Sequence, residues 1–222
     1  MINTPQYNLA KFLDTVIKPV IPSAHMLNST SEFLSKLDNA DLSKAKLVSY
    51  DVESLFTNVP LAEVIDIACD YVYNSSTPPT FERKHFRKLL QFATSGEFLY
   101  KDRLYKQVNG VAMGSPLGPT LANLFLANME SIWVDHETAP KYFYRYVDDI
   151  FTVFDPERDT SVRFLEYLNN QHPNLRFTTE VGPTTLPFLD ILIDVSETPV
   201  ETCVYRKPTL TGQLLHFSAF PL

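Results

Sequence analysis

Two adjacent aspartates, Asp148 and Asp149, lie between two strongly β-forming runs, and this arrangement constrains the fold more than any other feature. The segments 142–144 and 150–154 are rich in aromatic and β-branched residues, which favour strands. The sequence therefore predicts a β-hairpin whose turn carries two carboxylates. Neighbouring carboxylates repel each other, so a divalent cation or a strong set of hydrogen-bond donors is expected between them. The alternative is an ordinary solvated turn, which most Asp-Asp pairs are.

Composition restricts the class of protein. With 222 residues, 45% of them hydrophobic and 20% charged, the chain is able to bury a core in one domain or two small ones. The net charge of −7 argues against strong binding to nucleic acid by this chain alone, because basic surface supplies most of that affinity. No apolar run is long enough to span a bilayer, and the first residues do not resemble a signal peptide. We therefore expect no membrane association.

The two cysteines, Cys69 and Cys203, are far apart in the sequence and suggest neither a zinc site nor a disulfide framework. Both are expected to be core or half-buried thiols. We therefore expect a reducing intracellular compartment, and no dense Lys/Arg run distinguishes the nucleus from the cytoplasm.

Hydrophobic periodicity and turn residues predict alternating helices and strands. Helices are expected over 9–17, 33–37 and 86–93, from about Pro119 to Trp133, and on a face of Val162, Leu165 and Leu168. The helix at 33–37 is expected to have its N-cap at Ser29, Thr30 or Ser31. A further helix is expected to start at Asn58 as its N-cap, with Pro60 in its first turn. Strands are expected over 46–52, in a hairpin of 98–100 with 104–106, in the aspartate hairpin, and over 176–181, 186–195 and 203–205. This order indicates an α+β fold of packed layers.

Asp51 ends the apolar strand that begins near Lys46. A carboxylate at that place is expected at a sheet edge, where it could join Asp148 and Asp149 in a cluster. Three carboxylates favour hard, oxygen-liganded ions such as Mg²⁺ or Mn²⁺, and two such ions lower the barrier to phosphoryl transfer. The alternative for Asp51 is a strand-end residue that caps the turn at Asn58.

A loop with two glycines, residues 114–119, leads into the expected long helix, which carries Asn123 on its second turn. Glycine lets the backbone approach a ligand closely, and a helix N-terminus favours anionic groups. The alternative is a plain loop with a serine cap and a proline start.

Three ordered motifs resemble those of reverse transcriptases. Residues 49–60 (SYDVESLFTNVP) are similar to the first palm motif, residues 113–123 (MGSPLGPTLAN) to the second, and residues 146–149 (YVDD) to the third. The strings SYDVESLFTNVPL, LPFLDILI and VYRKPT resemble the Penelope-like retroelement branch. This resemblance covers nearly the whole chain.

The resemblance implies a polymerase palm with a ferredoxin-like βαββ core and packed helices, in which the fingers are incomplete and most of the thumb is absent. Residues 1–205 would form the palm with partial fingers, and residues 206–222 would begin the thumb or form a truncated tail. The basic segments found in relatives would then lie outside this chain, which would account for its acidic balance.

The resemblance also implies residue roles. Asp51, Asp148 and Asp149 would be catalytic and would bind two metal ions. The incoming nucleotide would be framed by Phe56, Gly114, Ser115, Pro116, Asn123 and Tyr146. Phe56 would exclude a 2′-hydroxyl by its bulk, unless it only packs in the core. Primer and template would be contacted by Leu186, Phe188, Leu189, Arg206 and Lys207, although both basic residues could instead be solvated surface charges.

The implied activity is RNA-directed DNA polymerisation by a retroelement enzyme, with Mg²⁺ or Mn²⁺, an RNA template, a DNA primer and deoxynucleoside triphosphates. Two alternatives remain: an inactive palm remnant that serves as a binding or structural domain, and an RNA-dependent RNA polymerase, against which Phe56 argues. The resemblance also implies a lysine after the aspartate pair as the acid that protonates pyrophosphate, but no lysine occurs between Lys141 and Lys207. His172 could replace it as an acid, or could simply end a helix before Pro173.

Overall fold

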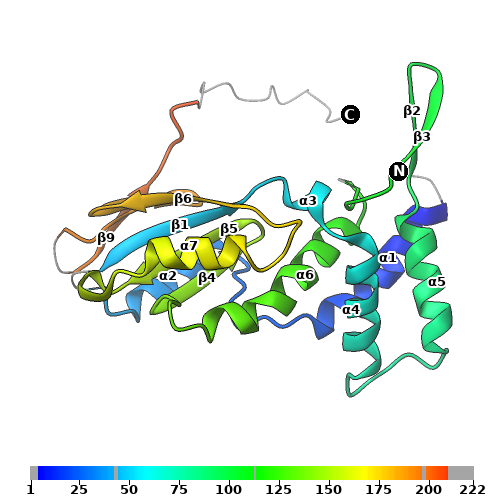
Figure 1. The fold of residues 1–222 in the computed structure, drawn as a ribbon, viewed down its shortest axis with the longest axis horizontal. Coiled ribbons are helices and arrows are strands. Elements are labelled where there is room, and N and C mark those ends of the chain that lie inside the picture. The colour runs from blue at the N-terminus through cyan, green and yellow to red at the C-terminus, as the bar shows by residue number, and fades with distance from the viewer. Residues whose placement is uncertain (1–4, 43–44, 113, 197–198, 210–222) are drawn as a thin grey trace.

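The computed structural model describes residues 5–42, 45–112, 114–196 and 199–209 of the chain (Figure 1). The helices are α1 (Pro5–Ile17), η1 (Lys18–Val20), α2 (Thr30–Asp38), α3 (Leu55–Asn58), α4 (Leu61–Tyr73), α5 (Arg83–Thr94), α6 (Leu117–Val134), η2 (Pro156–Arg158) and α7 (Ser161–Asn169). The strands are β1 (Lys46–Val52), β2 (Glu97–Tyr100), β3 (Arg103–Lys106), β4 (Tyr142–Tyr146), β5 (Asp149–Phe154), β6 (Phe177–Gly182), β7 (Thr185–Phe188), β8 (Ile191–Asp194) and β9 (Glu201–Val204). The predicted α+β class is confirmed.

The central sheet has four antiparallel strands in the order β4-β5-β1-β6. Strands β4 and β5 form the predicted aspartate hairpin, and β1 lies between β5 and β6 although it precedes both by many residues. Helix α6 connects toward β4 and helix α7 connects β5 to β6, which is the ferredoxin-like arrangement that the family resemblance implies. Strands β7, β8 and β9 form a separate three-stranded sheet.

The two faces of the central sheet have different coverings. Along β1, Val48, Tyr50 and Val52 point into the larger core, where α1, α4, α6 and α7 contribute their apolar faces. Leu47 points to the opposite face and packs in a smaller core with residues of α2, β7 and β8. Ser49 and Asp51 share the face of Leu47, because side chains alternate along a strand. Figure 1 shows α1, α4 and α5 gathered at the end of the molecule away from this smaller core.

Several expected boundaries need correction. Asn58 is not the N-cap of α4 but the last residue of α3, and Pro60 stands at the N-cap of α4. A left-handed residue, Ser54 with φ 51°, starts the short α3 that the sequence pattern did not reveal. Helix α6 begins at Leu117, slightly before the expected Pro119. Ser29 is the N-cap of α2 as predicted, because its side chain accepts a hydrogen bond from the Glu32 amide.

Two predicted apolar runs are wrong in detail. Residues 186–195 are not one strand but parts of β7 and β8, because the chain reverses at Leu189, which has φ 56°. Helix α7 does not bury Val162, which is 67% exposed; Phe164 is buried in the larger core instead, together with the predicted Leu168, while the predicted Leu165 is half-buried.

Cys69 is buried as predicted, whereas the prediction for Cys203 is wrong, because its strand β9 lies at the exposed edge of the small sheet. Both cysteines are free thiols. Among the described helices, none combines the length and apolar character that crossing a bilayer requires.

Candidate active site

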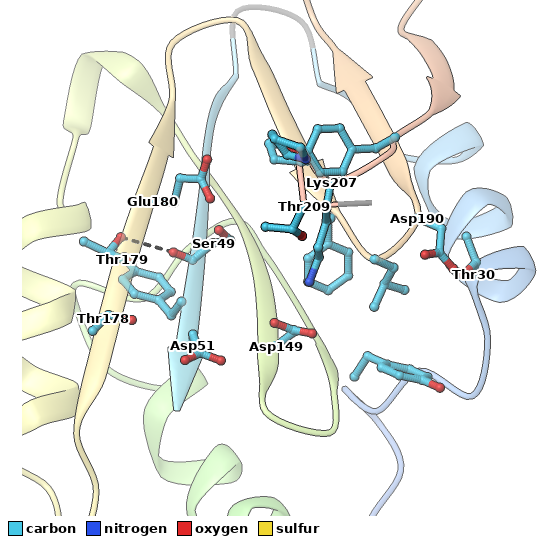
Figure 2. Close-up of a pocket in the computed structure, with 17 residues that line it drawn as sticks. Thr30, Ser49, Asp51, Asp149, Thr178, Thr179, Glu180, Asp190, Lys207 and Thr209 are labelled. Carbon is cyan, nitrogen blue, oxygen red and sulfur yellow. Dashed lines mark hydrogen bonds between the residues drawn. The ribbon is translucent and has the colours of Figure 1, made fainter. Parts of the chain in front are cut away.

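Asp51 and Asp149 lie opposite each other in the antiparallel register of β1 and β5, so both side chains leave the same face of the sheet. They line a groove of about 630 Å³ between the central sheet and the β7–β8–β9 sheet, which Figure 2 shows with Asp51 and Asp149 side by side. Tyr146, the register partner of Asp149 in β4, lines the same groove. The pairing therefore brings together two of the three predicted catalytic carboxylates, from positions about a hundred residues apart.

The third carboxylate, Asp148, occupies the turn of the hairpin. Val147 before it has φ 56°, a left-handed conformation that costs free energy for a β-branched residue and occurs mainly at turns and functional sites. The carbonyl oxygen of Asp148 accepts a hydrogen bond of 3.2 Å from the Val52 amide, at the end of β1. The turn is thus attached to the strand that carries Asp51, although the side chain of Asp148 is not part of the groove lining.

The carboxylates influence one another electrostatically. Burial, followed by the charges of Asp148 and Glu53, raises the pKa of Asp51. Burial, followed by the charges of Asp148 and Asp51, raises the pKa of Asp149. The ammonium group of Lys207 opposes both shifts, and Figure 2 shows Lys207 extending into the groove on the Asp149 side. Among the described residues that line the groove, the aspartates therefore bring more negative charge than Lys207 neutralises.

This donor set fits a divalent cation of the hard, oxygen-preferring kind. Asp51 and Asp149 offer carboxylate oxygens from adjacent strands, and burial together with the neighbouring carboxylates raises the pKa of both groups, which a bound cation would offset. Within the described ranges, no group of three or more His, Cys, Asp or Glu side chains is close enough to hold a metal ion. Asp148 would therefore have to turn toward the other two carboxylates for a complete ligand set to form.

We expect Mg²⁺ or Mn²⁺ to raise the melting temperature of the chain, because an ion bound only by the folded state stabilises that state. At about ten times its dissociation constant the ion would add roughly 1.4 kcal/mol, or about 3–6 °C for a chain of this size. Thermal unfolding with added metal, and with NaCl at matched ionic strength, measures the shift. The Asp148→Asn/Asp149→Asn double variant should lose it. An equal shift in that variant would place the ion elsewhere.

A buried arginine forms hydrogen bonds that hold the aspartate hairpin, and the sequence analysis did not identify it. Arg145 on β4 is fully buried and forms an ion pair with Glu130 of α6. One of its guanidinium nitrogens, Nη1, also donates to Asn123 Oδ1 and to the carbonyl oxygen of Val147, each at 2.8 Å. The last of these bonds reaches the strained turn residue. A charged residue inside an apolar strand, with a glutamate inside an apolar helix, was the available signal.

The residues expected to frame the nucleotide lie around the start of α6 and on α3. Gly114 is exposed with φ 89°, Ser115 is buried, and Pro116 forms the N-cap of α6 without a side-chain cap. Asn123 is engaged by Arg145, and Phe56 is half-buried against the larger core. Of this set only Tyr146 lines the groove, so the nucleotide role of the others stays a prediction.

Gly110, which the sequence analysis did not single out, lies where the loop before α6 contacts α3. Gly110 has φ 76°, and a Cβ atom there would lie 2.7 Å from the Phe56 carbonyl oxygen, which excludes other residues. The next amide, of Val111, donates to that same oxygen at 2.7 Å. The first motif is therefore in direct backbone contact with the segment that immediately precedes the second motif.

The residues expected at the primer and template are divided by the structure. Phe188, Leu189 and Lys207 line the groove, whereas Leu186 is fully buried in the smaller core and Arg206 lies outside the groove lining. The predicted thumb segment 206–222 lies largely outside the described residues.

His172 is engaged away from the groove. Its Nε2 lies 3.1 Å from Glu63 Oε2, and its Nδ1 accepts a hydrogen bond of 3.1 Å from the Asn174 amide. The ring packs edge-on against Phe125. This position fits the helix-end alternative, because His172 does not line the groove that holds the carboxylates.

A ferredoxin-like antiparallel sheet, with paired aspartates from its central strands facing a groove, defines the palm of a nucleic-acid polymerase. The sequence model of "Reverse transcriptase (RNA-dependent DNA polymerase)" matches residues 5–179, most of the chain. The chain therefore belongs to the reverse transcriptase family. Comparison with curated proteins found no match.

Solved structures share the fold. Apo telomerase from Candida tropicalis aligns with a TM-score of 0.66 at 12% identity over 89% of this chain and 40% of the telomerase chain. Telomerase from Candida albicans, solved with a fragment of telomeric RNA, aligns with a TM-score of 0.64 at 11% identity over 88% of this chain and 38% of that one. The RNA-dependent RNA polymerase of BmCPV at its elongation state aligns with a TM-score of 0.53 at 15% identity over 86% of this chain and 20% of that one. The chain thus spans less than half the length of each.

Proposed function

We propose that this chain is the palm of a retroelement RNA-directed DNA polymerase of the Penelope-like branch, which adds deoxynucleotides to a primer 3′-hydroxyl on an RNA template. The observation that carries the proposal is the register pairing of Asp51 with Asp149 on the groove face. Family membership and the strings LPFLDILI and VYRKPT at the other groove wall support it. We place the enzyme in a reducing intracellular compartment.

The carboxylates of Asp51, Asp148 and Asp149 would hold two Mg²⁺ or Mn²⁺ ions. When bound, these ions would supply activation of the 3′-hydroxyl and stabilisation of the leaving pyrophosphate. Tyr146 would support the primer end, since it lines the groove beside Asp149. Lys207 would contact primer phosphate from the opposite wall, where its charge already offsets that of the aspartates.

Primer extension on an RNA template with Mg²⁺ or Mn²⁺ tests the proposal. Metal-dependent extension that prefers deoxynucleotides is expected. A chain that binds a primer–template duplex with metal and still extends nothing would contradict it.

Phe56 gives a test of sugar selection. We expect Phe56→Ala to reduce the preference for deoxynucleotides over ribonucleotides by roughly 10- to 200-fold, the range that contacts of this size supply. Single-nucleotide incorporation with each type of triphosphate measures the ratio. Phe92→Ala, which removes a ring that is 52% exposed on α5, is the matched control and should leave the ratio unchanged. If the Phe56→Ala variant and the unmodified chain have the same deoxynucleotide-to-ribonucleotide ratio, Phe56 only packs in the core and does not select the sugar.

A folded palm without polymerase activity is the second candidate. It is favoured by the absence, within the described residues, of a ready set of three metal-ligating side chains. Metal-dependent stabilisation together with failed extension would select it. Against an RNA-dependent RNA polymerase, whose fold is similar, Phe56 remains the proposed barrier to the 2′-hydroxyl.

A further inference from the structure

The β2–β3 hairpin is an exposed element that the proposed site does not use. It rises beyond the helices on the side of the molecule where α3 follows β1 (Figure 1). All four residues of β3 are exposed, and Tyr100 and Leu104 keep 57% and 66% of their surface in solvent. A two-stranded hairpin gains little stability by itself, so exposed rings on one are better explained by binding than by folding.

The two faces of this hairpin differ in chemistry. Tyr100 is the register partner of Arg103, and Tyr105 lies two residues beyond Arg103 on the same face. The rings of Tyr100 and Tyr105 have centroids 6.3 Å apart and are tilted by 59°, so neither covers the other face to face. Lys101 Nζ lies 5.4 Å from the Tyr100 ring centroid. Leu104 and Lys106 occupy the opposite face.

We propose that Tyr100, Arg103 and Tyr105, with Lys101 at the turn, form an aromatic face that binds single-stranded nucleic acid. Unpaired bases would stack on the two tyrosine rings, since every base has a π face, and the Lys101 and Arg103 cations would contact the phosphates. Charge complementarity favours this occupant over a protein surface. Two cations, Lys101 and Arg103, stand on this face and its turn beside one acid, Asp102, within a chain whose net charge is −7, whereas Lys106 on the opposite face is the register partner of Glu97.

The connection to the proposed active site is structural. The chain leaves β3 and returns directly to α3, where the Gly110 and Val111 amides donate to the Val59 and Phe56 carbonyls at 3.2 and 2.7 Å. Helix α3 in turn follows the strand that carries Asp51. This assignment rests on the proposed function: the bound strand is the unpaired part of the template, which extends beyond the primer duplex.

Fluorescence anisotropy with labelled oligo(U), oligo(dT) and a duplex of RNA tests the proposal on the full chain. Tyr100→Ala and Tyr105→Ala should each weaken binding of both single strands by about 5- to 150-fold, the range found when a stacking ring is removed. Leu104→Ala, at an exposed position on the opposite face, should leave binding unchanged. Tyr100→Phe keeps the ring and should restore the affinity.

The salt dependence of single-strand binding tests which cation contacts the phosphates. Arg103→Ala should reduce the slope of log affinity against log salt by about 0.7, the value for one phosphate contact to a single strand. Lys106→Ala on the opposite face should not change it. The proposal is wrong if the tyrosine variants bind single strands as the unmodified chain does, if Leu104→Ala loses as much, or if no single strand binds.

Primer extension distinguishes failure of this proposal from failure of the polymerase function. Tyrosine variants should lose extension on templates with a long 5′ overhang and keep it on templates whose overhang is too short to reach the hairpin. If the tyrosine variants extend primers normally and bind single strands as the unmodified chain does, the aromatic-face proposal is wrong while the polymerase function stands. Ring-dependent binding without any extension would support the aromatic face while overturning the polymerase function.

Discussion

Asp149→Asn and Asp148→Asn are each expected to reduce primer extension by at least two to three orders of magnitude, about the effect of losing one preorganised electrostatic contact to a transition state. Asparagine keeps the shape of the side chain and removes the charge that would hold a divalent cation in the groove. The loss should appear with both Mg²⁺ and Mn²⁺. Gel-based primer extension on an RNA template measures it.

Glu180→Gln is the matched control for these variants. Glu180 lies on β6, opposite Ser49, and lines the same groove wall without belonging to the aspartate hairpin. Its neutralisation should leave extension close to that of the unmodified chain.

In the absence of metal, the Asp149→Asn variant should have a melting temperature no lower than that of the unmodified chain, because burial and neighbouring charges already disfavour the ionised form of Asp149. Extension that survives Asp149→Asn would remove this residue from the catalytic role.

Arg145→Met is expected to have the largest effect on stability. Glu130 is 3% exposed, so removal of Arg145 would leave its carboxylate buried without a counter-charge. Breaking a buried pair in this way typically costs about 3–5 kcal/mol, which corresponds to roughly 6–20 °C in a chain of this size. Chemical and thermal unfolding measure the change. Arg163→Met, which opens the exposed Arg163–Glu137 pair, should cost less than about 1 kcal/mol.

The double variant Arg145→Met/Glu130→Leu separates stability from positioning. Replacing both charges by apolar groups should recover most of the lost stability, since no buried charge remains. It should not recover full extension, because the hydrogen bond from Arg145 to the Val147 carbonyl would still be missing from the strained turn. We expect kcat to stay low while the KM for nucleotide changes little. Full recovery of kcat together with stability would show that Arg145 acts only in folding.

Much of the local structure was predictable from the sequence. The strand before Asp51, the aspartate hairpin, the Ser29 cap and the long helix through Leu121 and Leu124 all follow from periodicity and turn chemistry between near neighbours. The errors fell where non-local packing decides. Val162 fits a helical apolar face as well as Phe164 does, and only the position of the central sheet makes Phe164 the buried one.

The candidate site was predictable in its residue types but not in its arrangement. Asp51 and Asp149 were singled out by their places at a strand end and a hairpin and by a resemblance of motifs, yet their direct opposition depends on β1 inserting between β5 and β6. The position of Lys207 near both carboxylates depends on β9 pairing with β8, which carries the chain back to the groove. No spacing along the sequence reports either pairing.

By itself, the sequence determined the class of fold, the candidate carboxylates and the family motifs, because these depend on residue propensity and on patterns within short segments. The tertiary structure alone decided which carboxylates share a groove, that Arg145 and Glu130 form a buried pair, and that Tyr100 and Arg103 share an exposed face. The physical reason is strand register. A shift of one residue in a pairing would move every side chain of a strand to the opposite face.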